Sequence, residues 1–325
     1  MTIGIFPASG GLGTSTYTHL LKLVPNDQVI LINRNPENVP QQYIDAGVRV
    51  RKASYESTFS ELEYAFSGID VLFLISYPSH VHDYRIKVQL PAVDAAKKAG
   101  VTHIFYSSLG FAGDHQSTSL AEVMQAHLDT ERHLARLAAA PASSFTYTSI
   151  REGLYAESTP IYTAFFDPRS VAESSSNNGE ILIPHDGSGP GVAWVKRDEL
   201  GEASGRLIAS YYHDHSKGGK EQGGFQFVNR TVLLTGPRVW SLAETVAVLG
   251  EIAGREVRIR AVPVDEYVRL PQVLAKFGSE EMARMWATAW DAIRAGETAV
   301  VAPELAAILG REPEAFEVAV RRHFA

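Results

Sequence analysis

The chain has 325 residues, a size that predicts one large domain or two closely associated domains. It is 45% hydrophobic and 21% charged, as in ordinary globular proteins, and its net charge of −7 disfavours nucleic-acid phosphates or an anionic membrane surface as a partner. The absence of cysteine excludes disulfides, thiolate catalysis and zinc–thiolate sites. The first residues contain no secretory signal pattern, and no apolar run is long enough to span a bilayer, so we expect a cytoplasmic protein.

The first predicted unit is a strand, a glycine-rich turn, a helix and a second strand. Residues 3–6 and 29–32 form the two apolar strands, and the turn between them and the helix consists of Ser9, Gly10, Gly11, Leu12 and Gly13. Such a unit binds dinucleotides, because glycines let the backbone approach the pyrophosphate and the helix N-terminus offers free N–H groups. The second strand ends at Arg34, where an acid would bind the ribose of NAD. Because a guanidinium suits a 2′-phosphate, the unit predicts NADP(H).

The glycine pattern is imperfect. Pro7 stands where the spacing G-x-x-G-x-x-G would need a glycine. Proline fixes φ and has no N–H, so the chain must enter the turn differently. Taken alone, the turn is equally compatible with an ordinary strand–turn–helix junction.

Strands and helices alternate through the first half of the chain. Apolar runs recur at 3–6, 29–32, 48–50, 71–75, 104–106 and 145–150, and helical patterns lie at 12–23, 57–67, 83–99 and 119–138. Runs that are apolar on both faces, separated by helices, predict an α/β fold with a Rossmann-type, doubly wound parallel sheet. Ligands bind at the carboxyl edge of such a sheet. That edge would carry the glycine turn, Arg34, Ser54, residues 76–78, residues 107–110 and residues 151–155.

The second half is less regular. Residues 167–191 are rich in Ser, Asn, Gly and Pro, and residues 213–224 have the composition of a loop. Helical patterns return at 197–211, 241–253, 264–275 and 278–295, with short strands at 232–235 and 257–260. We therefore divide the chain into a cofactor-binding domain at 1–155 and a smaller, mostly helical substrate-binding lobe at 156–325, part of which returns to the sheet.

Several segments together resemble the NmrA-like group of atypical short-chain dehydrogenases, which includes quinone reductases, isoflavone-reductase-like enzymes, fungal tailoring reductases and redox-sensing regulators. The resemblance rests on an ordered set: residues 68–76, 95–108 (Ala-Ala-Lys-Lys-Ala-Gly-Val-Thr-His-Ile-Phe-Tyr-Ser-Ser), 127–131, 151–157, 195–203, 233–237, 241–244 and 309–313. It implies NADP(H) bound in a cleft between a Rossmann domain and a C-terminal substrate lobe.

The resemblance also implies roles for individual residues. The glycine turn would hold the pyrophosphate and Arg34 the 2′-phosphate. The end of the fourth strand, Ile75, Ser76 and Tyr77, would lie under the adenosine ribose and pyrophosphate. The residues implied near the nicotinamide and its ribose are Ser107, Ser108, His127, Gly153 and Tyr155.

The chain departs from the family where chemistry is expected. The Tyr-x-x-x-Lys of ordinary short-chain dehydrogenases reads Val123-Met-Gln-Ala-His127 here, and the usual Arg-Pro-Gly reads Arg151-Glu152-Gly153. We predict His127 as the proton relay or ribose anchor, because the ordinary histidine pKa suits general acid catalysis. A solvated or capping histidine is the alternative. Tyr77 and Tyr155 are further proton-donor candidates, with aromatic packing at the cleft rim as their alternative.

Two other clusters are assigned to structure. His213, Asp214 and His215 precede a glycine-rich loop without a third ligand at metal-site spacing, so we predict no metal site. Met282, Trp286, Trp290 and Ile293 share one helix face, which favours packing, with an aromatic substrate pocket as the alternative.

We predict an NADPH-dependent reductase of a conjugated or aromatic small molecule, such as an enone, quinone or imine, with secondary-metabolite tailoring implied by the resemblance. Two alternatives stay open: a non-enzymatic NADP(H) sensor that binds a partner protein, and an NADP(H)-retaining enzyme that catalyses a non-redox cyclisation. The expected partner is a small-molecule substrate, without nucleic acid or membrane, and the sequence leaves both monomer and homodimer open.

Overall fold

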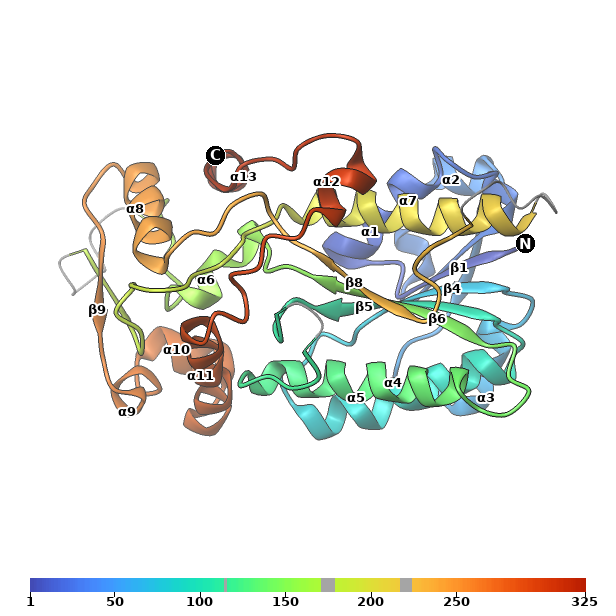
Figure 1. The fold of residues 1–325 in the computed structure, drawn as a ribbon, viewed down its shortest axis with the longest axis horizontal. Coiled ribbons are helices and arrows are strands. Elements are labelled where there is room, and N and C mark those ends of the chain that lie inside the picture. The colour runs from blue at the N-terminus through green and yellow to red at the C-terminus, as the bar shows by residue number, and fades with distance from the viewer. Residues whose placement is uncertain (114–115, 171–178, 217–223) are drawn as a thin grey trace.

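The apolar runs of the first half lie side by side in one parallel sheet of seven strands (Figure 1). The strand order is β3-β2-β1-β4-β5-β6-β8, so the direction of winding reverses between β1 and β4. The strands are β1 (Ile3–Phe6), β2 (Val29–Asn33), β3 (Arg49–Lys52), β4 (Val71–Ile75), β5 (His103–Leu109), β6 (Thr146–Glu152) and β8 (Arg230–Leu234). The predicted doubly wound Rossmann fold is confirmed.

This computed structural model describes residues 1–113, 116–170, 179–216 and 224–325. Parts of the two irregular segments predicted at 167–191 and 213–224 lie outside the described residues. No helix within the described ranges is long and apolar enough to cross a membrane.

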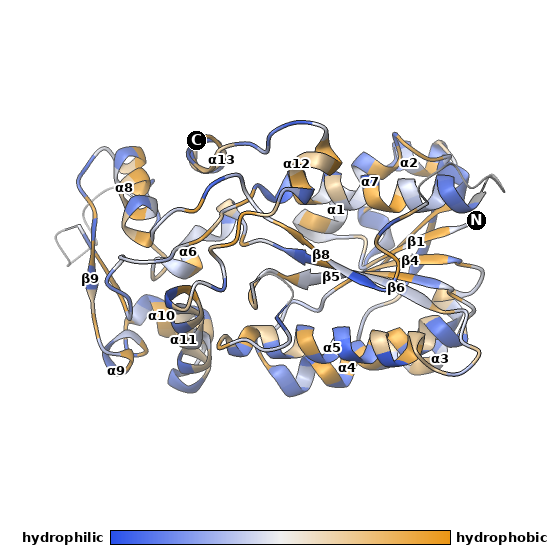
Figure 2. Ribbon diagram, in the orientation of Figure 1, coloured by the Kyte–Doolittle hydropathy of each residue, from blue (hydrophilic) through white to orange (hydrophobic). Residues whose placement is uncertain are grey.

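Helices cover both faces of the sheet, with apolar sides turned inward (Figures 1 and 2). One face carries α3 (Phe59–Phe66), α4 (His82–Lys98) and α5 (Glu122–Ala138), and the other carries α1 (Gly10–Leu20), α2 (Gln41–Asp45), α7 (Arg197–Ser216) and α12 (Glu304–Leu309). Separate hydrophobic cores lie on the two faces. This arrangement leaves the carboxyl edge of the strands open to the lobe.

The chain beyond residue 155 returns to the sheet through α7, β8 and α12. Helix α7 packs closely on α1. The two helices approach so closely that a side chain at Gly201 would collide with Ser15, and one at Gly205 would lie 3.2 Å from the Leu20 amide nitrogen. Asp198 accepts a hydrogen bond of 2.6 Å from Ser15. The predicted boundary at 155 therefore separates the lobe from the sheet only in part.

The C-terminal lobe lies beyond the carboxyl edge and has its own core (Figure 1). It contains the parallel pair β7 (Glu180–Ile183) and β9 (Arg258–Ala261) with α6 (Thr159–Tyr162), α8 (Leu242–Ala253), α9 (Val264–Tyr267), α10 (Pro271–Phe277), α11 (Glu280–Arg294) and α13 (Phe316–Phe324). The sequence did not predict β7. The helix predicted at 264–275 is two helices, because Pro271 suits the first turn of a new helix.

Candidate cofactor and active site

The glycine turn joins β1 to α1 and leaves the helix N-terminus accessible. Ser9 is the N-cap residue and its hydroxyl makes no capping bond, and Gly10 has a φ of 71°, which a side chain would strain. A Cβ at Gly13 would lie 2.7 Å from the carbonyl oxygen of Pro7. Pro7 thus enters the turn through a cis peptide bond and packs against the third glycine, while Leu12 is buried beneath.

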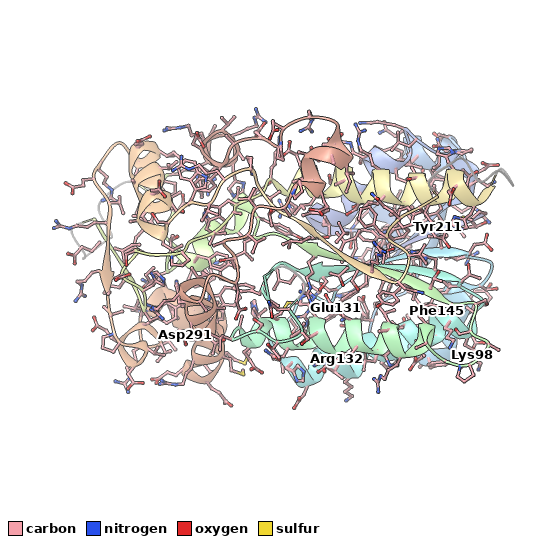
Figure 3. The ribbon with its side chains drawn as sticks, in the orientation of Figure 1. Lys98, Glu131, Arg132, Phe145, Tyr211 and Asp291 are labelled. Atoms are coloured by element: carbon pink, nitrogen blue, oxygen red, sulfur yellow. The ribbon has the colours of Figure 1, made fainter. Side chains whose placement is uncertain are left out.

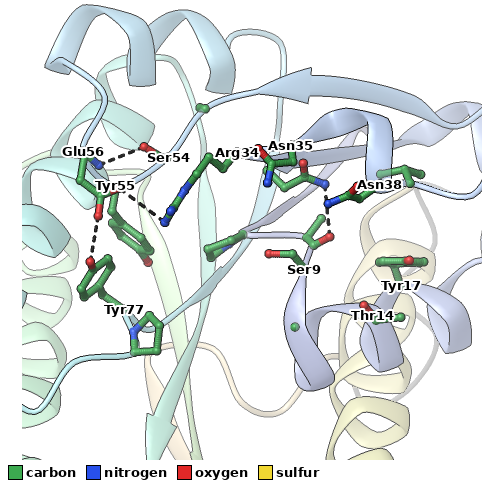
Figure 4. Close-up of a pocket in the computed structure, with 17 residues that line it drawn as sticks. Ser9, Thr14, Tyr17, Arg34, Asn35, Asn38, Ser54, Tyr55, Glu56 and Tyr77 are labelled. Atoms are coloured by element: carbon green, nitrogen blue, oxygen red, sulfur yellow. Dashed lines mark hydrogen bonds and ion pairs between the residues drawn. The ribbon is translucent and has the colours of Figure 1, made fainter. Parts of the chain in front are cut away.

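A cavity of about 420 Å³ lies at the ends of β1, β2, β3 and β4 (Figure 4). Its lining includes Ser9, Gly10, Arg34 and Ser54 from the predicted site. Asn33 also lines it, and the Oδ1 of this residue is buried without a hydrogen-bond partner in the described part of the chain. This half of the sheet receives one nucleotide of a bound dinucleotide. The unpartnered Asn33 oxygen can accept a hydrogen bond from a hydroxyl or amine group of adenosine. The open N-terminus of α1 can donate to its phosphate.

Glu56 and Tyr77 meet on the same side of the cavity. The hydroxyl of Tyr77 donates to Oε1 of Glu56 at 2.8 Å, and Arg34 lies 4.0 Å from the other carboxylate oxygen (Figure 4). This hydrogen bond and burial raise the pKa of Tyr77 to about 12. Tyr77 lines the cavity in the half of the sheet edge that fits the adenosine. The position of Tyr77 therefore does not support its predicted role as a proton donor to substrate.

A second cation accompanies Arg34 at the strand ends. Lys52 is the last residue of β3 and pairs in register with Asn33, the last residue of β2. A neighbouring cavity of about 430 Å³ is lined by Arg34, Lys52 and Ser54 among others. The side chain of Arg34 is 71% exposed and has room to turn toward an anion. The two cations and the Ser54 hydroxyl form a group that fits a 2′-phosphate.

Arg197 approaches the glycine turn from the opposite side of the edge. A side chain at Gly11 would collide with its guanidinium. Both carboxylate oxygens of Glu157 accept from the Arg197 amide, at 3.1 and 3.2 Å, which anchors the start of α7. Within the described ranges, the Arg197 guanidinium has no ion pair. A cation without an ion pair beside the glycine turn is a candidate binding residue that the sequence did not predict.

Tyr155 and Glu152 lie at the end of β6, on the half of the edge that would receive the nicotinamide nucleotide. Glu152 is 1% exposed, and its Oε2 accepts a hydrogen bond from the Tyr155 hydroxyl. Its Oε1 is buried with no partner of good geometry among the described residues. Burial raises the pKa of Glu152 to about 7, against the opposing effect of the Tyr155 and Ser107 hydroxyls. Glu152 is therefore a protonated or readily protonated carboxyl group near neutral pH.

Ser107 and Ser108 face opposite sides of the sheet. Ser107 pairs in register with Ile150, which places it on the Glu152 face. The hydroxyl of Ser108 instead donates to Glu131 at 2.6 Å, and Glu131 forms a buried ion pair of 2.7 Å with Arg151. Figure 3 shows Glu131 pointing from α5 toward the sheet. Ser108 is thus engaged in a structural contact, whereas Ser107 lies on the Glu152 face and its hydroxyl acts on that carboxyl.

Two other predicted residues of the strand ends, Ile75 and Gly153, make close packing contacts. Ile75 ends β4, with its Cδ1 3.2 Å from the position of a Cβ at Gly13, and Ser76 follows it. A Cβ at Gly153 would lie 2.8 Å from the Leu234 carbonyl oxygen, so this glycine permits close packing of β6 on β8.

His127 lies in a closed polar network between α4, α5 and β5. Its Nε2 is 2.7 Å from Nη2 of Arg85, and its Nδ1 is 3.0 Å from the Tyr106 hydroxyl. Because arginine can only donate, Nε2 accepts and Nδ1 carries the proton. Burial and then the Arg85 charge hold the pKa of His127 well below its usual range. With 5% exposure and both nitrogens engaged, His127 fits neither the predicted role as proton relay or ribose anchor nor the alternative of a solvated or capping histidine.

The remaining predicted clusters have separate contacts. Trp286 and Trp290 are buried in the lobe core, as the packing interpretation predicts. His213 contacts the Leu23 carbonyl oxygen, whereas His215 contacts that of Tyr211. No group of three or more potential metal ligands forms in the part of the chain that the structure describes.

Comparison with known proteins identifies the family. Residues 1–292 match the model of the NmrA-like family. The chain belongs to the NmrA-like family. It is 30% identical over 318 residues to the NmrA-like family domain-containing oxidoreductase flvB of Aspergillus flavus, covering 97% of this chain and 92% of that protein. It is also 30% identical to quinone oxidoreductase 2 of Escherichia coli, over 78% of this chain and 76% of the relative.

Solved NmrA-like structures share the fold over their whole length. The Citrobacter sp. triphenylmethane reductase complexed with NADP(H) has a TM-score of 0.74 and 26% identity, covering 99% of this chain and 100% of that chain. The E. coli NADPH-dependent quinone oxidoreductase complexed with NADPH has a TM-score of 0.76 and 25% identity, covering 100% of both chains. The predictions of an NmrA-like oxidoreductase and of NADP(H) agree with these relatives.

Three residues of the candidate site were missed by sequence reasoning. Glu152 was noted as a departure from the family pattern, and its signal was an acidic residue directly following a buried apolar strand. Lys52 had a weaker signal, as a cation at the end of the strand next to Arg34. Arg197 had none, because its approach to Gly11 depends on how α7 packs.

Proposed function

We propose that this protein is an NADPH-dependent reductase of a conjugated or aromatic small molecule, such as a quinone, enone or imine. The observation that carries the proposal is the division of one sheet edge into a cationic, glycine-lined half and a half that holds a buried carboxyl–phenol pair. The first half fits a phosphorylated dinucleotide, and the second fits proton transfer to a reduced substrate. The names of the flvB, quinone oxidoreductase and triphenylmethane reductase relatives support the same class.

The cofactor-binding residues follow from this division. The amides at the start of α1 and the Arg197 guanidinium would hold the pyrophosphate, and Arg34 with Lys52 would hold the 2′-phosphate. Ser54 and Tyr77 would flank the adenosine. When bound, NADPH supplies a hydride, while the protein supplies orientation and a proton.

A substrate site is proposed where aromatic side chains link the lobe to the loop after β4. The ring centroids of His80 and Trp286 are 5.2 Å apart, Tyr162 lies 5.4 Å from Trp286, and Phe277 stacks on Trp286 at 5.9 Å. Trp286 and Tyr162 are buried, so the accessible part of this cluster is the exposed His80 and the half-buried Phe277, and an aromatic rim of this kind suits a planar conjugated molecule. Tailoring of a secondary metabolite is part of this proposal, and it rests on the family resemblance.

The proposal is tested in two steps. Purified protein is titrated with NADPH, NADP⁺, NADH and NAD⁺ while nicotinamide fluorescence or heat is followed, and we expect selective binding of the phosphorylated pair. NADPH oxidation is then measured with a 1,4-naphthoquinone, a cyclic enone and a cyclic imine. Turnover with at least one acceptor is expected. Preferential binding of one redox form without turnover would instead favour the sensor, and binding of none of the four would refute the cofactor site.

A further inference from the structure

Reduction of a conjugated oxygen acceptor requires a proton as well as a hydride, and the edge of the sheet offers one arrangement suited to supply it. Glu152 ends β6 and is 1% exposed, and Tyr155 lies three residues further along the chain. The Tyr155 hydroxyl donates to one carboxyl oxygen, while the other has no partner of good geometry in the described segments. The Ser107 hydroxyl also acts on this carboxyl, and Tyr155 is the partner that lies beyond the strand end, so it is the group through which a Glu152 proton would leave.

The position of Tyr155 is fixed by the chain on both sides. The Ala156 amide donates to the Val195 carbonyl oxygen at 2.8 Å, and the Val195 amide donates to that of Leu154 at 3.0 Å. This pairing holds the Tyr155 ring 5.9 Å from the guanidinium carbon of Arg197, whose side chain lies on the glycine turn. Tyr155 is therefore placed between the pyrophosphate cradle and the start of the lobe, where a bound nicotinamide nucleotide and its substrate would meet.

We propose that Tyr155 is the proton donor of the reduction and that Glu152 resupplies its proton. This inference rests on the proposed reductase function. The two electrons and one hydrogen come from the reduced nicotinamide. For transfer the Tyr155 hydroxyl turns to the substrate, and protonated Glu152 donates to the phenol oxygen. The O–H bond of Tyr155 breaks as an O–H bond forms on the substrate oxygen, and the Glu152 O–H bond breaks as its proton passes to the phenolate oxygen. After product leaves, the buried Glu152 carboxylate regains a proton from water through the Tyr155 hydroxyl. Tyr155 is the catalytic residue, and Glu152 acts through it.

The charges around the pair fit this direction of transfer. The charged groups that face it are Arg197 from α7 and Glu157 from the following turn. Burial raises the pKa of Tyr155 well above its usual range, as do Glu152 and Glu157, whereas Arg197 opposes the rise. Tyr155 thus stays protonated at neutral pH, and Arg197 stabilises the phenolate that forms on transfer.

The choice of acceptor separates proton donation from hydride transfer. Reduction of a 1,4-naphthoquinone needs both, whereas a triarylmethane dye cation such as crystal violet becomes neutral on accepting a hydride alone. Tyr155→Phe is therefore expected to lower kcat for naphthoquinone by about 100-fold or more, the usual range for loss of a general acid. Its rate with crystal violet and its Kd for NADPH should stay within about twofold, because a phenyl ring preserves the packing. Tyr147→Phe, at the opposite end of β6, is the matched control.

Glu152→Gln supplies the second test. Wild-type kcat with naphthoquinone should fall as the pH rises through about 7, and this fall should be absent in Glu152→Gln. Infrared difference spectra should contain a carboxylic acid carbonyl band near neutral pH that disappears in the same variant, a readout independent of turnover. Equal losses with both acceptors in Tyr155→Phe, no loss with either, or an unchanged pH profile in Glu152→Gln would overturn the inference. A wild-type protein that binds NADPH and reduces neither acceptor would refute the reductase function itself.

Discussion

Replacing Glu152 with glutamine should stabilise the protein, and more strongly as the pH rises. Burial raises the pKa of this carboxyl from 4.5 to about 7 in the native state. Below pH 4.5 Glu152 is protonated in both the native and the unfolded chain, so its ionisation does not change the free energy of unfolding. Between the two values the unfolded chain releases the proton while the native chain keeps it, so the native state loses stability with increasing pH. Above about pH 7 the loss is complete.

The magnitude follows from the size of the shift. Each pKa unit corresponds to about 1.4 kcal/mol, so the full penalty for Glu152 is about 3 kcal/mol. Roughly 1 kcal/mol of it is already present at about pH 5, so the wild-type protein should lose about 2.5 kcal/mol between about pH 5 and about pH 8 from this group. Glutamine is neutral throughout, so the stability difference between variant and wild type should grow by that amount.

Urea unfolding at several pH values measures this difference directly. Glu312→Gln makes the same chemical change on an exposed side chain and is the matched control. Its stability difference from wild type should vary little with pH. If the Glu152→Gln difference stays constant to within about 0.5 kcal/mol across this range, Glu152 ionises at an ordinary pKa. The carboxyl would then hold no proton at neutral pH, and the resupply of Tyr155 would have no source.

The remaining predictions concern the cofactor and the buried network. Arg34→Ala should weaken NADPH binding roughly tenfold to a hundredfold and leave NADH binding unchanged, because only NADPH carries the 2′-phosphate. Arg49→Ala, at the other end of β3 from Lys52, is the control. Equal losses of affinity for both cofactors would contradict the assignment of Arg34. Arg197→Ala should weaken NADPH and NADH alike, about tenfold, because both contain the pyrophosphate, and calorimetric titration that finds no loss would return this residue to a packing role. His127→Ala should lower the free energy of unfolding by about 1–3 kcal/mol, because a buried guanidinium loses its acceptor. His323→Ala, on the surface, should not, and an unchanged unfolding midpoint in the first variant would refute the structural role.

The candidate cofactor half of the edge could be predicted from the sequence because its signals are local. The glycine turn, the helix after it and Arg34 lie within one strand–helix–strand unit, and the carboxyl ends of parallel strands necessarily meet at one edge. The apolar strands were equally clear, since burial on both faces leaves nearly continuous apolar runs. Strand β7 was missed because it pairs with β9, far along the chain, rather than with a sequence neighbour.

The proposed catalytic half depends on the burial of its side chains and on contacts between distant parts of the chain, which sequence periodicity does not encode. His127 has the helical register expected of a site residue, but Arg85 of α4 and Tyr106 of β5 close over it. Arg197 reaches Gly11 only because α7 packs on α1 through small residues. A sequence reading places such residues on elements, while the tertiary contacts decide which of them face a ligand.

Two tyrosine–glutamate pairs at the same sheet edge illustrate how environment assigns function. Tyr77 donates to Glu56 just as Tyr155 donates to Glu152. Glu56 is 37% exposed, and although burial raises its pKa, the hydrogen bond from Tyr77 and the charge of Arg34 help to bring it below the usual range. Glu56 is thus ionised at neutral pH and has no proton to return to its tyrosine. Glu152 is 1% exposed and holds a proton up to about pH 7, so only the second pair can donate repeatedly.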